Sequence, residues 1–195
     1  KTMGVEFVRS VCFFTLLTMG YVNIAFGKCP KITTKLDFDL SQYMGTWYEQ
    51  QRFPNLFQSK NSTCVFANYK LEGDKTVRVF NAEKTKDDWN SITGMAIQPH
   101  PESTPGSLLV SFNGGKNYGP YDVLDTDYQS YSCVYSCTSF GILTIENAWI
   151  LSRRRTLSQS QLAELMEKFN KFGIDTKKFH ITTQPKECDY IAPPS

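Results

Sequence analysis

The sequence predicts a single all-β domain, an antiparallel barrel or sandwich, followed by one helix. Short runs of β-forming residues recur at close intervals, turn residues separate them, and only one segment has helical periodicity. A length of 195 residues suits one domain. The expected strands are 46–53, 64–71, 76–82, 91–97, 107–112, 121–125, 130–136 and 145–152.

Several of these runs alternate between two faces. Val77, Val79 and Asn81 fall on one face of their strand, and Arg78 and Phe80 fall on the other. An antiparallel sheet with one buried face produces this alternation. Aromatic residues occur on both faces, so the alternation leaves barrel and sandwich open.

The helix is expected after the last strand. Ser158 is a suitable N-cap, and Gly173 is a natural stop. Its apolar positions recur with helical spacing at Leu162, Leu165, Met166 and Phe169. We expect this stripe to pack on the outside of the sheet.

Residues 1–27 resemble a secretory signal. Arg9 precedes a largely apolar stretch over 11–20, and Ala25 and Gly27 suit a cleavage site after residue 27. The alternative, a retained membrane anchor, would need a longer uninterrupted apolar run. We therefore expect residues 1–27 to be removed and residues 28–195 to form a secreted, extracellular domain.

Charge and cysteines limit the partners. The formal net charge is +2 and the only basic run is 153–155, which gives no reason to expect a nucleic-acid partner. Five cysteines remain after residue 27, which suggests two disulfides and one spare thiol without fixing the pairing. No Cys/His cluster has zinc spacing, so no metal site is expected.

Three motifs together carry a family resemblance. They are Gly45-Thr46-Trp47 at the first strand, Thr126-Asp127-Tyr128 between the sixth and seventh strands, and Arg153 at the end of the eighth. In this order they resemble the signature regions of the lipocalins, and the likeness extends from Lys28 to Cys188. Within the family it is greatest to the apolipoprotein D-like branch, with the carotenoid-carrying crustacyanin subunits and the insect bilin-binding proteins nearby.

The resemblance implies an eight-stranded antiparallel up-and-down β-barrel of the lipocalin/calycin type, with the C-terminal α-helix packed outside. Trp47 would plug the closed end, and Arg153 would lie against its ring. The other signature residues, Gly45, Thr126, Asp127 and Tyr128, would likewise have structural roles. The resemblance also implies the disulfides Cys29–Cys137 and Cys64–Cys188.

The spare thiol would then be Cys133. Crustacyanins bridge a cysteine at this place to one on the helix, but the aligned helix position here is Leu165. We therefore expect no such bridge.

A lipocalin barrel implies a carrier of one small hydrophobic ligand: a lipid, steroid, retinoid, carotenoid or bilin. No cofactor is required, although a carotenoid or bilin pigment would fit. Strand parity counted from Trp47 and the resemblance predict a ligand-binding set of Glu49, Gln51, Phe53, Tyr69, Val79, Asn81, Phe112, Tyr121, Val123, Asn147 and Trp149. Val110 falls on the same inward face as Phe112.

Other functions receive less support. A coloration protein that assembles with other subunits is the main alternative. A lipid-surface or signalling protein, in contact with a membrane or lipoprotein through Leu56 and Phe57, is another. An enzyme is not expected, because His100 and His180 lack a neighbouring nucleophile motif.

Two further expectations concern the mature protein. We expect a monomer or weak oligomer, because a closed barrel has no free sheet edges. We also expect a glycan at Asn61, which begins the sequon Asn61-Ser62-Thr63.

Overall fold

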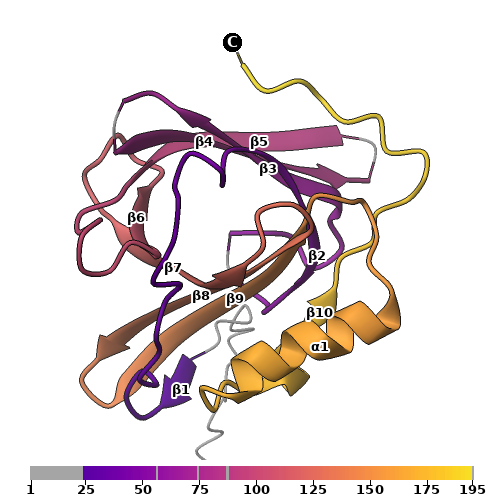
Figure 1. Ribbon diagram of the computed structural model, residues 1–195. Coiled ribbons are helices and arrows are strands. Elements are labelled where there is room, and N and C mark those ends of the chain that lie inside the picture. Colours follow the sequence, from indigo (N-terminus) through magenta and orange to yellow (C-terminus); the bar gives the residue numbers. More distant parts are fainter. Residues whose placement is uncertain (1–23, 56, 74, 87, 195) are drawn as a thin grey trace, which may run out of the picture.

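The computed structural model describes residues 24–55, 57–73, 75–86 and 88–194. Each barrel strand pairs antiparallel with the next, and β2 also pairs with β9, which closes the barrel (Figure 1). The eight barrel strands are β2 Gly45–Arg52, β3 Thr63–Leu71, β4 Thr76–Thr85, β5 Asp88–Ile97, β6 Ser107–Ser111, β7 Gly119–Thr126, β8 Tyr131–Phe140 and β9 Leu143–Ser152. The predicted up-and-down barrel is confirmed.

Three short elements lie outside this closed set. β1 (Ile24–Phe26) pairs with the first residues of β9, β10 (His180–Ile181) pairs with the end of β2, and η1 (Thr176–Lys178) is a 3₁₀ turn. β1 ends the segment that we expect to be removed, and residues 1–23 of that segment lie outside the described residues. The β2–β9 pairing that closes the barrel does not involve β1.

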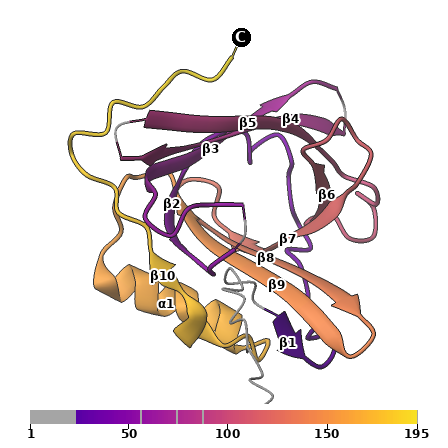
Figure 2. The same ribbon diagram turned by 180° about the vertical axis from the view of Figure 1, so that it is seen from behind.

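The helix α1 (Gln159–Asn170) lies on the outside of the barrel, as predicted (Figures 1 and 2). Ser158 accepts a hydrogen bond from the backbone of Gln161, whose side chain completes a capping box. Leu162, Leu165 and Phe169 are buried in a cluster with residues of β7, β8 and β9. No helix within the described residues is long and apolar enough to cross a membrane.

The hairpins are longer than the sequence predicted. β4 and β5 continue to Thr85 and Asp88, which pair with each other. Trp89, which lies between the expected strands 76–82 and 91–97, pairs with Lys84 and packs its ring against Phe66 at 5.9 Å on the outside of the barrel. This extension was not predicted, because residues near the hairpin tip are of types that usually form turns. The tip itself is a tight turn, in which Lys86 adopts the left-handed conformation (φ 57°).

Trp47 closes one end of the barrel. Its side chain is fully buried, and its Nε1 donates to the Tyr43 carbonyl at 2.9 Å. The Arg153 guanidinium lies 3.6 Å from the ring centroid and donates to the carbonyl oxygens of Thr46 and Met44 at 2.8 and 2.7 Å. Gly45 (φ 93°) leaves room for it, since a Cβ there would lie 3.3 Å from Arg153 Nη1.

The Thr126-Asp127-Tyr128 turn supports the same end. Thr126 Oγ1 donates to the Tyr131 carbonyl at 2.6 Å, and Asp127 Oδ1 accepts from the Tyr131 backbone at 3.0 Å. Tyr128 has a left-handed backbone (φ 65°), and its carbonyl accepts from Arg153 Nε at 3.0 Å. The signature residues therefore form one connected structural unit.

The two expected disulfides are both present. Cys29 joins Cys137, and Cys64 joins Cys188, with Cα–Cα distances of 5.8 Å each. Cys133 is free and fully buried beneath α1, with its sulfur 3.9 Å from the Leu165 carbonyl. The first disulfide attaches the N-terminal arm to β8, and the second attaches the C-terminal tail to β3.

Candidate ligand-binding cavity

The barrel encloses a cavity of about 710 Å³ with a mostly apolar wall. This volume lies in the ordinary range for small-molecule sites. The wall includes eight of the residues predicted from the sequence: Glu49, Tyr69, Val79, Asn81, Phe112, Tyr121, Asn147 and Trp149. Val110, on the same inward face as Phe112, also belongs to it. That these residues contact a ligand remains a prediction.

Three predicted residues do not lie in this wall. A bulge interrupts β2, so that Glu49 pairs with Leu151 and Gln51 with its neighbour Ile150. The inward parity counted from Trp47 therefore fails beyond Glu49, which accounts for Gln51 and Phe53. Phe53 packs beneath α1, with its ring centroid 4.8 Å from that of Phe179.

Val123 is also outside the cavity wall. It is fully buried in the inner cluster that surrounds Trp47 at the closed end. Val123 points inward, as strand parity predicted, but this end of the barrel is filled by side chains. Parity along a strand predicts which face a residue occupies, and it does not predict how deep the cavity extends.

Three tyrosine hydroxyls meet in the cavity wall, next to the inner cluster around Trp47. The Tyr121 hydroxyl lies 3.0 Å from those of Tyr43 and Tyr69, and Tyr43 also bonds Ser132 at 2.8 Å. Burial raises the pKa of Tyr69 to about 12 and raises the pKa of Tyr43 further. The sequence reasoning missed Tyr43, because it lies in the turn before β2, where strand periodicity gives no signal.

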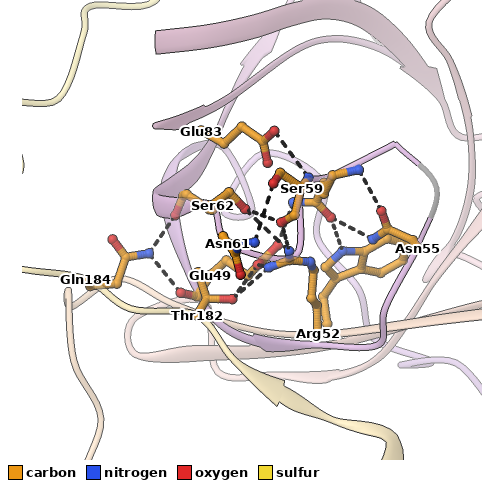
Figure 3. A network of polar contacts seen from close by, with 12 residues as sticks. Glu49, Arg52, Asn55, Ser59, Asn61, Ser62, Glu83, Thr182 and Gln184 are labelled. Carbon is orange, nitrogen blue, oxygen red and sulfur yellow. Dashed lines mark hydrogen bonds and ion pairs between the residues drawn. The ribbon is translucent and has the colours of Figure 1, made fainter. Parts of the chain in front are cut away.

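Glu49, also in the cavity wall, is 3% exposed and forms an ion pair with Arg52 (Figure 3). Its Oε1 accepts from Arg52 Nη1 at 2.8 Å and from Thr182 Oγ1 at 2.5 Å, and its Oε2 accepts from Gln58 Nε2 at 3.0 Å. The carboxylate is therefore already satisfied by protein groups.

The same network holds residues 53–55 and 57–62, which we call the mouth loop, against the barrel. Arg52 Nη2 donates to the Ser59 carbonyl and to Ser62 Oγ, at 2.5 and 3.3 Å (Figure 3). Gln58 Oε1 accepts from Trp149 Nε1 at 3.4 Å, which joins the loop to the cavity wall. Because Phe57 and Gln58 themselves line the cavity, the loop covers part of its entrance.

The residues considered for surface contact and catalysis are dispersed. Phe57 is 67% exposed, and Leu56 lies outside the described residues. His100 lies in the loop between β5 and β6, and His180 is exposed in β10, where its backbone pairs with that of Arg52. Among the residues that the structure describes, no group of three or more His, Cys, Asp or Glu could hold a metal ion.

Comparison with known proteins agrees with this geometry. The model of the lipocalin-like domain matches residues 38–184. Apolipoprotein D of Cavia porcellus is 37% identical over 169 residues, covering 85% of this chain and 87% of the relative. The Lazarillo protein of Schistocerca americana is 31% identical over 160 residues, covering 80% and 74% of the two chains.

Solved structures show the same fold. Insecticyanin from the tobacco hornworm Manduca sexta superposes with a TM-score of 0.74 at 27% identity, covering 85% of this chain and 91% of that one. Lobster apocrustacyanin A1 gives 0.73 at 23% identity, covering 86% and 94%, and supports the fold alone. With the family model matching most of the chain and the signature residues forming the closed end, this chain belongs to the lipocalin family.

Proposed function

We propose that this protein is a secreted carrier that holds one small hydrophobic molecule inside its barrel. The observation that carries the proposal is the apolar cavity of about 710 Å³, whose wall includes the aromatic side chains of Phe112, Tyr121 and Trp149. A lipid, steroid, retinoid, carotenoid or bilin suits such a wall, and the chemistry of binding needs no cofactor or metal.

Secretion is part of the proposal. Residues 1–27 have the pattern of a secretory signal, and the two disulfides are stable in an oxidising compartment. Asn61 is exposed in a turn of the mouth loop and begins a glycosylation sequon, so we propose that it carries a glycan.

Trp149 provides the test of the carrier function. Its ring stacks on Tyr121 in the cavity wall, with centroids 6.4 Å apart. A bound ligand should change its fluorescence. Trp149→Ala should weaken binding by roughly 5- to 150-fold, because a large aromatic contact of ~1–3 kcal/mol is lost. Trp89→Ala, which removes a tryptophan from the outside of the barrel, is the matched control and should leave affinity unchanged.

The measurement is a fluorescence titration with fatty acids, steroids, retinoids, carotenoids and bilins. A visible absorption band in protein purified from its source would identify a pigment and favour the coloration role. If no ligand of the panel binds, the carrier proposal is wrong. If one binds tightly and Trp149→Ala binds it equally well, the cavity wall near Trp149 is not the contact surface.

Contact with a lipid surface is a second candidate function. Phe57, Ile92 and Phe112 all belong to the cavity wall and are 67%, 49% and 39% exposed, so apolar side chains surround the entrance. An apolar rim of this kind suits a lipid or lipoprotein surface from which a ligand is collected. Binding of vesicles without uptake of any ligand would favour this function over carriage. We propose a monomer or weak oligomer in solution.

A further inference from the structure

Two hydrogen-bond acceptors in the cavity wall lack a protein partner. Asn81 and Glu83 lie two positions apart on β4, so their side chains share its inward face. The Oδ1 atom of Asn81 and the Oε2 atom of Glu83 are buried and accept no hydrogen bond from the described residues. Buried acceptors normally have a partner, which here must come from water or from a ligand that donates.

The charge of the wall has one sign. Among the described residues that line the cavity, the charged ones are Glu49 and Glu83, and none is Lys, Arg or His. Glu49 is neutralised by Arg52 at 2.8 Å. The second oxygen of Glu83 accepts only the long hydrogen bond from the Ser59 backbone, at 3.4 Å. A ligand carboxylate at this level would therefore face an anion and find no cation in the wall.

The tyrosine cluster deeper in the barrel does not favour the binding of an anion either. Burial raises the pKa of Tyr69 to about 12 and that of Tyr121 well above its ordinary value, so negative charge is disfavoured there. The same loss of solvation would act on a ligand carboxylate. The hydroxyls of Tyr43, Tyr69 and Tyr121 can still bond a neutral oxygen.

We infer that the cavity selects a neutral hydrophobic molecule bearing a hydroxyl or N–H group, and that it discriminates against the corresponding carboxylate. The donor binds at Asn81 and Glu83, and the apolar body packs along Val79, Phe112 and Trp149. This inference rests on the proposed carrier function and specifies the chemistry of its ligand.

Retinol and retinoic acid test the discrimination, since they share one carbon skeleton and differ in the polar end. Quenching of tryptophan fluorescence at pH 8 reports the binding of each. We expect retinol to bind at least ~10-fold more tightly, which corresponds to ~1.4 kcal/mol. Retinyl methyl ether, which keeps the skeleton of retinol and lacks the hydroxyl hydrogen, is the third ligand and should bind more weakly than retinol.

Variants that remove one charge test whether the cavity wall causes the discrimination between retinol and retinoic acid. Glu83→Gln keeps the shape of the side chain and removes its charge, so it should improve retinoic acid binding by about 10-fold and weaken retinol binding, because the hydroxyl then donates to a neutral amide oxygen. Glu102→Gln removes the same charge from an exposed loop position away from the cavity, and should change neither affinity. If Glu83→Gln fails to fold, Asn81→Leu removes the neighbouring acceptor and should weaken retinol binding alone.

Each outcome has a defined reading. Equal affinities of the wild type for retinol and retinoic acid overturn the inference and leave the carrier function intact. Retinyl methyl ether that binds as tightly as retinol does the same, because no donor is then needed. If no retinoid, carotenoid or other apolar ligand binds, the proposed function itself fails and the inference falls with it.

Discussion

Replacing Trp47 with alanine should destabilise the closed end of the barrel more than any other single tryptophan substitution. The side chain is 0% exposed, Arg153 covers one face at 3.6 Å, and the Tyr43 ring lies 5.1 Å away. Truncation of a buried aromatic residue costs ~3–5 kcal/mol. The Tyr43 carbonyl is not left without a partner, since Arg153 Nη2 also donates to it at 3.3 Å, so no desolvation cost is added.

The expected loss of unfolding free energy converts directly into a lowering of the melting temperature. For a chain of this size each kcal/mol lowers Tm by about 2–4 °C, so Trp47→Ala should melt roughly 6–20 °C below the wild type. Circular dichroism with both disulfides intact measures it. Trp47→Phe, which keeps a ring beneath Arg153, should recover part of the loss.

Trp89→Ala is the matched control. Trp89 is partly exposed and packs its ring on Phe66 and Tyr190 outside the barrel, so its removal should cost less. A Trp47→Ala protein that melts within about 2 °C of the wild type would refute the structural role of the plug, because the magnitude follows from burial. A Trp89→Ala protein that melts lower than Trp47→Ala would refute the ranking of the two sites.

Two chemical predictions concern single side chains. Cys133 should resist iodoacetamide at pH 8 in the folded protein and react after unfolding, because burial excludes solvent and raises the pKa of its thiol; rapid labelling of the native state would contradict the packing beneath α1. Asn61 should carry a glycan when the protein is secreted from eukaryotic cells, since it is exposed within its sequon. Peptide mapping tests this, with Asn61→Gln as the control that cannot be glycosylated, and an unmodified Asn61 would contradict the prediction.

The strands and the closed end were predictable because their signals are local. Alternation along 76–82 identified the inward face that β4 presents, and the helical spacing of Leu162, Leu165 and Phe169 identified the buried stripe of α1. The disulfide pairing came from the family resemblance, since the cysteine positions alone allow other pairings. Strand ends were less predictable, because the hairpin containing Trp89 continues through residues that usually form turns.

The parts of the site that escaped prediction depend on distant contacts. Nothing near Glu49 in the sequence shows that Thr182, 133 positions away, donates to its carboxylate. The bulge between Glu49 and Gln51 exchanges the inner and outer faces, and no proline or glycine there marks it. Sequence parity therefore placed Phe53 inside, whereas the structure places it under the helix.

The two disulfides determine how the protein would respond to a mechanical pull on its ends. Cys29–Cys137 and Cys64–Cys188 span 108 and 124 positions and overlap, so a covalent route runs from Cys29 along the chain to Cys64 and then directly to Cys188. Tension between Cys29 and Cys188 would be borne by that short route. The longer chain between Cys64 and Cys137, which includes β4 to β7, joins the same two cross-linked points and would stay slack until the short route is extended. The short route contains β2 and the mouth loop, so a pull on the two ends of the domain would act first on the cover of the cavity.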